Sequence, residues 1–491
     1  MPRASVPFAE WRPDIATLDS QFANVADNVF AGINSYKPIP GLLPFSAPIP
    51  DAPIRGLTSA RKLDGTWMVF AGTQTKLYSW TNSTGWVNVS RTTGGPYNVD
   101  INELWSFAQF GQNLIAVQSA NEPQTINVDS GTAFANLGGS PPLARTVAQI
   151  GDFVVLAGLV SNRRKIAWSA INDSTSWTPG INLSDVQEFP DGGPVTSVQG
   201  GEIGYAVQDR AIRTMQFLPG DTTYVFNFSR VLRDKGCISP YAAITVGNVL
   251  YFLAEDGFYS ITGQGVVPIG QDKVNEWFLA NSDIGRRAIV QVAISNKPYV
   301  VWAFHSNSST QLYDRILIYN WSNGRWSTGT VYAYAWAQLA TTPFDLDTTD
   351  PGEPGDDLLD STAHPLDSLF YLGGRPFVCA FDEQGRLCEL NGPNLPATME
   401  TSETHLVPGQ RAFVSDVYPL TDAPGSLIKV AIRERLQDPI VWGIDFPLEI
   451  TGSASVLTSS RLHRFRVTNP RAEVWTHAQG VQVEVQPDGT A

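Results

Sequence analysis

The stretch Gly151-Asp-Phe-Val-Val-Leu-Ala-Gly158 decides the fold, because the same phrase recurs along most of the chain. It joins a turn residue and a polar residue to a short apolar run, and a close copy, Gly-Thr-Trp-Met-Val-Phe-Ala-Gly, begins at Gly65. An apolar run of this length between turn residues predicts a buried strand. Looser copies begin at Gly111, Gly201, Gly247, Lys297 and Asp367.

The seven copies begin 46, 40, 50, 46, 50 and 70 residues apart. The last interval contains an acidic, proline-rich insertion of 25 residues, 343–367, and subtracting it leaves 45. A period in the mid-forties suits a four-stranded propeller blade, at about 5–6 residues per strand plus turns. We therefore expect an all-β fold with a β-propeller over residues 56–394. Seven blades are favoured, or six if two copies of the phrase belong to one blade.

Two segments predict hairpins within the blades, because each has an apolar strand, an Asn/Gly turn and a returning strand that starts on Trp. They are Leu77–Asn82 leading to Trp86, and Ile318–Gly324 leading to Trp326. Their aromatic side chains are predicted to pack between neighbouring blades, and the alternative is a stacking platform for sugar rings.

The two ends of the chain differ from this repeat. Residues 395–491 show long alternating strands, such as the strict period of two in Val481–Gln486, and predict a C-terminal β-sandwich. Residues 1–55 lack the phrase and hold nine prolines before residue 54. That composition predicts an extended N-terminal arm along the outside of the propeller.

The composition of the chain argues against several classes of protein. The 491 residues are 43% hydrophobic and 16% charged, which excludes general disorder. The net charge of −14 repels phosphate backbones and disfavours sequence-specific DNA binding. Three scattered cysteines without C-x-x-C spacing suit a reducing compartment. The N-terminus does not resemble an export signal, and no apolar run has the length of a membrane span.

Catalytic motifs are missing from the sequence. There is no Gly-Lys dipeptide for a P-loop, no H-E-x-x-H and no G-x-S-x-G, and the five histidines stand singly. We therefore expect no enzyme activity, no cofactor and no metal site. A carboxylate pair for glycoside hydrolysis stays open, because in a propeller such residues converge from distant blades.

Two charged clusters are the candidate functional residues. The insertion carries acids without any base and is interpreted as a solvated loop, or as an element facing a channel lumen or a partner. The stretch 461–467 alternates basic and apolar residues and is interpreted as a solvated strand face, an inter-subunit ionic surface or a phosphate contact. The acidic candidates are Asp345, Asp347, Asp350, Glu353, Asp356, Asp357 and Asp360, with Asp367 beyond them, and the basic candidates are Arg461, Arg464 and Arg466.

Several phrases resemble those of phage packaged-DNA stabilisation proteins, which form the tail nozzle or hub of short-tailed phages. The resemblance covers residues 1 to about 395 in outline and one segment near the C-terminus. It is carried by Val6–Asp14, Asn34–Gly41, Ile166–Trp177, Arg233–Pro240, Ala254–Tyr259, Pro268–Trp277 and Val474–Ala478.

The resemblance implies a structural virion protein that is assembled in the host cytoplasm and located in the phage tail. It implies a homo-oligomeric ring, a hexamer, that contacts a portal-adaptor protein and a tail needle, spike or fibre protein. Double-stranded DNA would pass through without sequence-specific binding, and packaged DNA would be retained. The alternative is a tail-associated propeller that binds or degrades host glycans during adsorption.

Overall fold

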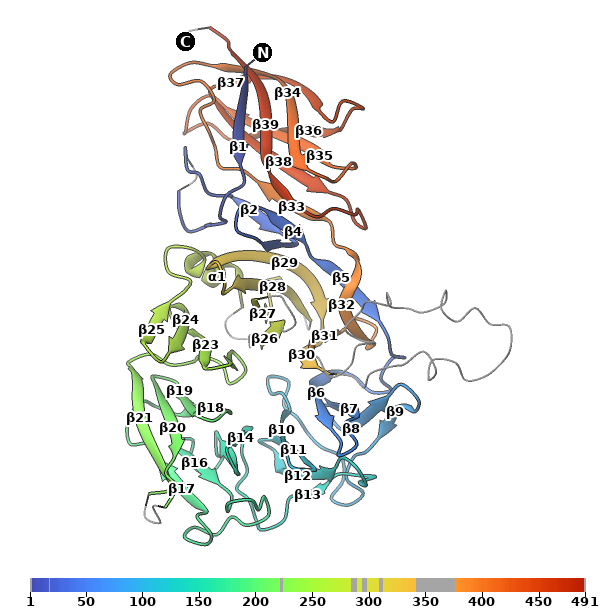
Figure 1. The fold of residues 1–491 in the computed structure, drawn as a ribbon, viewed down its shortest axis with the longest axis vertical. Helices are drawn as coiled ribbons and strands as arrows, with labels where there is room; N and C mark the ends of the chain where they lie inside the picture. The colour runs from blue at the N-terminus through green and yellow to red at the C-terminus, as the bar shows by residue number, and fades with distance from the viewer. Residues whose placement is uncertain are drawn as a thin grey trace, which may run out of the picture.

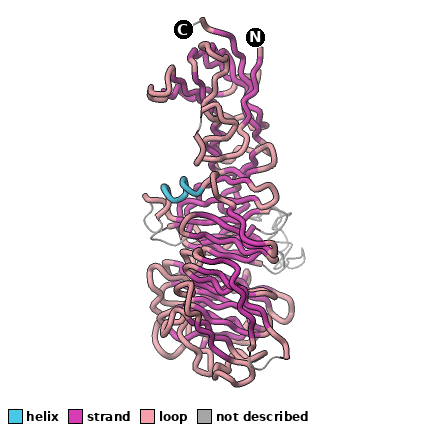
Figure 2. The backbone as a smooth tube through the Cα atoms, turned by 90° about the vertical axis from the view of Figure 1, so that its left-hand side faces the viewer, coloured by secondary structure: helices cyan, strands magenta, loops and turns pink. Residues whose placement is uncertain are grey.

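The computed structural model describes residues 2–16, 18–220, 224–283, 289–293, 298–308, 312–340 and 376–489. The molecule is elongated, with a ring of sheets at one end and a smaller two-sheet body at the other (Figure 1, Figure 2). Both chain termini lie at the far end of the smaller body (Figure 1). The one helix of the described ranges, α1 (Asn275–Asn281), has seven residues. No described helix is both long and apolar enough to cross a membrane.

The ring consists of four-stranded antiparallel units, of which the described residues contain seven. Units 1 and 2 are β6 (Ile54–Arg61), β7 (Trp67–Thr73), β8 (Leu77–Thr81), β9 (Gly85–Asn88) and β10 (Ser106–Phe110), β11 (Asn113–Gln118), β12 (Asn121–Asn127), β13 (Ala135–Asn136). Units 3 and 4 are β14 (Thr146–Ile150), β15 (Phe153–Ala157), β16 (Lys165–Trp168), β17 (Asp185–Glu188) and β18 (Val195–Gln199), β19 (Gly204–Gln208), β20 (Ala211–Phe217), β21 (Phe226–Arg233). Units 5 and 6 are β22 (Ala243–Val246), β23 (Val249–Ala254), β24 (Gly257–Thr262), β25 (Gly265–Pro268) and β26 (Ile289–Ala293), β27 (Tyr299–Phe304), β28 (Tyr313–Asn320), β29 (Arg325–Ala333). Unit 7 is β30 (Ala335–Leu339), β31 (Phe377–Phe381), β32 (Leu387–Asn394) and β5 (Pro40–Pro44).

The units form a closed series, because the first strand of each contacts the first strand of the next and β30 of unit 7 contacts β6 of unit 1. The predicted all-β, propeller-like fold is therefore confirmed. The recurring phrase forms the second strand of units 1 to 6. Its copy at Asp367 lies outside the described residues, and the second strand of unit 7 is β31.

The phrase is continuously apolar because both faces of its strand are buried. In β15, Phe153 and Val155 pack with residues of unit 4, while Val154 and Leu156 pack with residues of unit 2. The turn residue before it is glycine because Gly151 has a φ of 54°, a left-handed conformation that L side chains rarely adopt.

The smaller body is a β-sandwich, and strands from both ends of the chain build it. One sheet contains β1 (Arg3–Pro7), β3 (Val29–Ala31), β4 (Tyr36–Pro38), β34 (Ala412–Thr421), β37 (Ala454–Ser460) and β39 (Ala478–Pro487). The other contains β2 (Val25–Asp27), β33 (Ala397–Glu400), β35 (Leu427–Arg433), β36 (Val441–Pro447) and β38 (Leu462–Asn469). Side chains such as Val414, Phe465 and Val483 fill the space between the sheets.

The second sandwich sheet is continuous with unit 6 of the propeller. Strand β2 pairs in parallel with β29 through Asp27 and Thr328, and antiparallel with β33 through Val25 and Glu400. A single nine-stranded sheet therefore runs from the inner strand of unit 6 to the edge of the sandwich.

The structure corrects the prediction of an N-terminal arm outside the propeller. The first 44 residues supply two strands next to β39, the linking strand β2, and β5, which completes unit 7. Unpaired N–H and C=O groups at the edges of those sheets are satisfied in this way. The prolines suit the same role, because Pro7 and Pro38 end their strands and Pro44 ends β5.

Candidate functional site: the central cavity of the propeller

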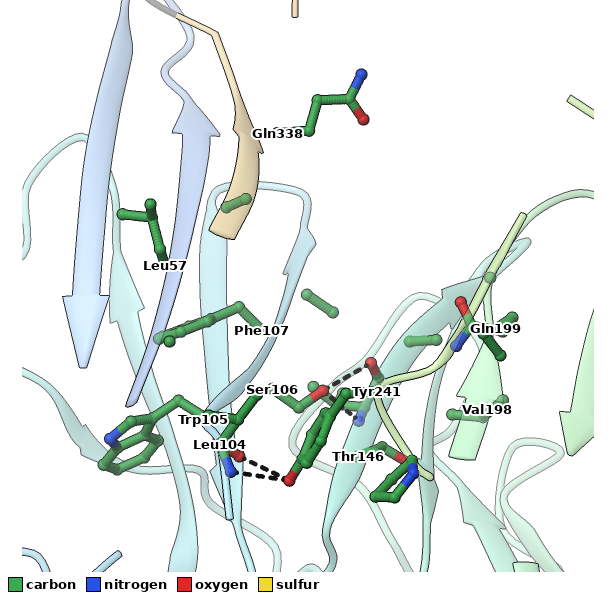
Figure 3. Close-up of a pocket in the computed structure, with 18 of the residues that line it drawn as sticks. Leu57, Leu104, Trp105, Ser106, Phe107, Thr146, Val198, Gln199, Tyr241 and Gln338 are labelled. Carbon is green, nitrogen blue, oxygen red and sulfur yellow. Dashed lines mark hydrogen bonds between the residues drawn. The ribbon is translucent and has the colours of Figure 1, made fainter. Parts of the chain in front are cut away.

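The first strands of the units surround a cavity of about 490 Å³ (Figure 3). Its wall comes from β6, β10, β14, β18 and β30 and from the segment that enters β22. A volume of this size is typical of a small-molecule site and is too small for a nucleic acid duplex. The lining residues include Leu57, Leu104, Phe107, Gln109, Thr146, Gln149, Val198, Gln199, Tyr241, Trp336 and Gln338.

The wall is uncharged and carries four glutamines, Gln109, Gln149, Gln199 and Gln338. Figure 3 shows Gln199 and Gln338 on strands from different sides of the opening. Gln109 also ties unit 2 to unit 1: its Oε1 accepts a hydrogen bond from the Arg61 backbone N–H at 2.8 Å, and its Nε2 donates to the Arg61 carbonyl at 2.6 Å.

A short sequence signal for this wall is present but is not among the sequence-based predictions. The triplet Ala-Gln-apolar occurs at Ala108–Phe110, Ala148–Ile150 and Ala337–Leu339, near the end of a first strand each time. It is short and its spacing is irregular, so the longer second-strand phrase obscures it.

Tyr241 crosses the cavity. Its hydroxyl accepts a hydrogen bond from the Leu104 N–H at 2.9 Å and lies 3.2 Å from the Leu104 carbonyl, to which it donates (Figure 3). Leu104 precedes β10 of unit 2 and Tyr241 precedes β22 of unit 5, and these units are not neighbours in the ring. The bridge therefore links two units that are not neighbours in the ring, at the end where these two strands begin.

The cavity can hold water or a small neutral polar molecule through amide and hydroxyl groups. Phosphate would find no cation among its lining residues. Elsewhere in the described ranges, no three His, Cys, Asp or Glu side chains come together as metal ligands. The acidic candidates Asp345 to Asp360, like Asp367, lie outside the described residues.

A second hollow of about 480 Å³ lies between units 2 and 3 and shares Gln149 with the cavity. Its lining is mostly polar, and Asp173 there already accepts hydrogen bonds from the backbone and hydroxyl of Thr175, at 2.8 and 2.7 Å. That carboxylate therefore stabilises its own turn.

The structure places the basic candidates Arg464 and Arg466 in ion pairs within the chain. Arg464 is buried and its Nη1 lies 2.9 Å from Glu400 Oε1, while Arg466 Nη2 lies 2.7 Å from Glu400 Oε2. The register of β33 and β38 places Glu400 opposite Arg466, so the counterion comes from a strand that lies far upstream in sequence. Arg461 precedes β38 and has an intermediate exposure.

The same cluster holds the N-terminal segment against the sandwich. Asn24 donates from Nδ2 to Glu400 Oε1 at 2.7 Å, and Glu403 forms ion pairs with Arg433 and Arg464. Both carboxylates are almost fully buried. Their arginine partners supply the counterions that a buried ion pair needs.

Both predicted hairpins form, with Trp80 opposite Trp86 and Tyr319 opposite Trp326. Trp326 is fully buried against Trp302, at 5.5 Å between ring centroids, and donates from Nε1 to the Ile269 carbonyl. Packing is therefore confirmed for Trp326, and the sugar-stacking alternative is wrong for that side chain. Trp86 is half-buried and donates to the Ala47 carbonyl at 3.0 Å.

Three of the solved structures that align with the chain do so at 9–11% sequence identity. No protein-family description and no curated protein matches the chain. The computationally designed Ika8 protein aligns with a TM-score of 0.39 at 10% identity, over 76% of this chain and 98% of that one. Virginiamycin B lyase from Staphylococcus aureus gives 0.38 at 9% identity, over 59% of this chain and 90% of the lyase. PorZ, a surface component of the type-IX secretion system of Porphyromonas gingivalis, gives 0.32 at 11% identity, over 63% of this chain and 35% of PorZ.

Proposed function

We propose that the chain is a structural subunit of a short-tailed phage tail, a nozzle or hub protein whose copies form a ring around the path of the exiting genome. The observation that carries the proposal is the nine-stranded sheet that joins unit 6 to the sandwich through β2. It makes the propeller and the sandwich one continuous body, because backbone hydrogen bonds replace a flexible linker. A wall element of a conduit needs that rigidity.

The DNA path would lie between copies and not along the axis of one propeller. The central cavity is smaller than a duplex and Tyr241 crosses it. A lumen for DNA therefore requires several copies around a common axis, which agrees with the ring of about six that the sequence resemblance implies.

Charge supports the same proposal. The insertion 343–367 contains eight acids and no lysine or arginine, so it contributes −8 of the net −14 and leaves −6 for the rest of the chain. An acidic wall repels the phosphate backbone and keeps friction on moving DNA low. The proposed partners are a portal-adaptor protein and a needle, spike or fibre protein.

The test is the absolute mass of the purified protein by light scattering, with negative-stain averages, both alone and with the adaptor protein of the same phage. A ring of about six copies with an open centre supports the proposal. A chain that stays monomeric at all concentrations, with and without the adaptor, contradicts it.

A further inference from the structure

The open edge of the sandwich carries an unusual concentration of exposed aliphatic side chains. Strand β36 pairs only with β35, and β37 pairs only with β34, so among the described residues both are edge strands. They also contact each other, which places the two edges on the same side of the sandwich. We name this surface the edge strip, and its exposed members are Leu436 (49%), Val441 (57%), Ile444 (70%), Ile450 (109%) and Leu457 (69%).

The turn between β36 and β37 connects the two parts of the edge strip. A turn closed by the Gly452 N–H donating to the Glu449 carbonyl connects β36 to β37 and carries Ile450 at its tip. Ile444 lies three residues before the end of β36 and Leu457 three residues after the start of β37. The turn therefore joins the two edges, with Ile444 on one of them and Leu457 on the other. The strip therefore extends from the turn along both edges.

The exposed area of the edge strip is large enough for a protein interface. At roughly 200 Å² for a fully exposed aliphatic residue, the five side chains expose about 700 Å², above the few hundred Å² typical of monomer surfaces. A standard interface buries about 800 Å² on each partner. The segment 436–457 contains Asp438, Asp445 and Glu449 but no lysine or arginine, which makes it a poor surface for anionic partners such as DNA.

The backbone indicates how a partner would bind. Both edges carry a register shift, between Lys429 and Ala431 opposite β36 and between Val414 and Asp416 opposite β37. Bulges of this kind bend an edge and prevent a regular strand from being added to it. Side-chain packing, and not sheet extension, is therefore the mode of contact.

We propose that the edge strip is the contact between neighbouring copies of this chain, and that it holds the ring together at its sandwich end. This contact rests on the proposed function, because in a ring each chain has neighbouring copies that can bind the edge strip. The strip lies on the sandwich, away from the propeller ring (Figure 1). Neighbours would pack sandwich to sandwich and leave the propellers free for other partners.

The experiment compares the full-length chain with the double variant Ile444→Asp/Leu457→Asp by light scattering over a range of concentrations. Both side chains are exposed, so the fold should tolerate the change, and circular dichroism and the urea midpoint check this. Leu63→Asp is the matched control, since Leu63 is 76% exposed but lies on unit 1 of the propeller. We expect the double variant to weaken self-association at least 100-fold, and the control to assemble like the wild type.

The outcomes separate the two proposals. If the wild type forms rings and the folded double variant forms them equally well, the edge strip is not the contact, while the ring remains. If the wild type forms only dimers that the double variant abolishes, the edge strip is the contact and the nozzle proposal loses support. If the wild type never self-associates, even with the adaptor, both proposals are overturned.

Discussion

Replacing His463 with leucine should make the sandwich less sensitive to acid. His463 lies on β38 between the two sheets, is inaccessible to solvent, and stacks on Phe465 with an interplanar angle of 7°. Neither ring nitrogen has a hydrogen-bond partner among the described residues. Burial lowers the pKa of His463 from 6.5 to about 4, because the charged imidazolium cannot be solvated there.

The direction and the size of this pH effect on folding stability follow from proton linkage. The unfolded chain binds a proton near pH 6.5 and the folded chain only near pH 4, so stability is complete above pH 6.5 and falls as the pH drops towards 4. At about 1.36 kcal/mol per pKa unit, the full loss of stability is about 3 kcal/mol, of which about 2 kcal/mol has occurred at pH 5.

The assay is urea unfolding of the wild type and His463→Leu at pH 7.5 and pH 5. Other groups also titrate in this range, but they are common to both proteins and cancel in the difference between them. The variant should be at least as stable as the wild type at pH 7.5, because leucine removes two unsatisfied polar atoms from the core. Its advantage should grow by about 2 kcal/mol at pH 5.

A direct titration by NMR of the histidine ring carbons provides an independent check, with the variant identifying the signal of His463. The reasoning is refuted if that signal titrates near pH 6.5, or if the stability difference between the two proteins is the same at both pH values. Either result would mean that His463 is solvated or hydrogen-bonded in solution.

Three further predictions concern single side chains. Glu400→Gln should cost about 3–5 kcal/mol in urea unfolding, because it removes the counterion of Arg466 and one of the two carboxylates that pair with the buried Arg464; an unchanged midpoint would show that the cluster is solvated. Trp326→Ala should cost about 3–5 kcal/mol as a cavity in the core, and Trp86→Ala clearly less, as measured by thermal unfolding. Tyr241→Phe should cost about 1–2 kcal/mol and speed hydrogen exchange at the Leu104 amide, and unaltered exchange there would contradict the bridge across the cavity.

The propeller was predictable because its strongest sequence signal is local. An apolar run such as Phe153–Ala157 sits in a unit whose four strands follow one another along the chain, so a period in the sequence reports a repeat in space. The hairpin ending at Trp326 is local for the same reason. Each of these elements carries its own pattern and its own turn residue.

The sandwich and the candidate site depend on contacts that no local pattern reveals. In the sequence, Arg464 and Arg466 resemble a free basic strand face. Only the pairing of β33 with β38 shows that Glu400 lies beside them. Strand β2 is three residues long, and its place between two domains follows from pairing with strands more than 300 residues away. The cavity wall was missed because its glutamines belong to several units and only the closed ring brings them together.

The location of the N-terminal strands has a consequence for how the protein is made. Arg3 pairs with Glu484, 481 residues along the chain. Strand β5 pairs with β32 to complete unit 7, so it has no partner until β32 has been made. A ribosome therefore releases the first strands long before their partners exist. Unit 7 can close only after β32 has been made, and the sandwich only after β39, near the end of the polypeptide. Folding with such distant contacts is slow and exposes unpaired edges in the meantime. Production in a cell would accordingly depend on chaperones, and fragments that end before β39 should accumulate as insoluble material.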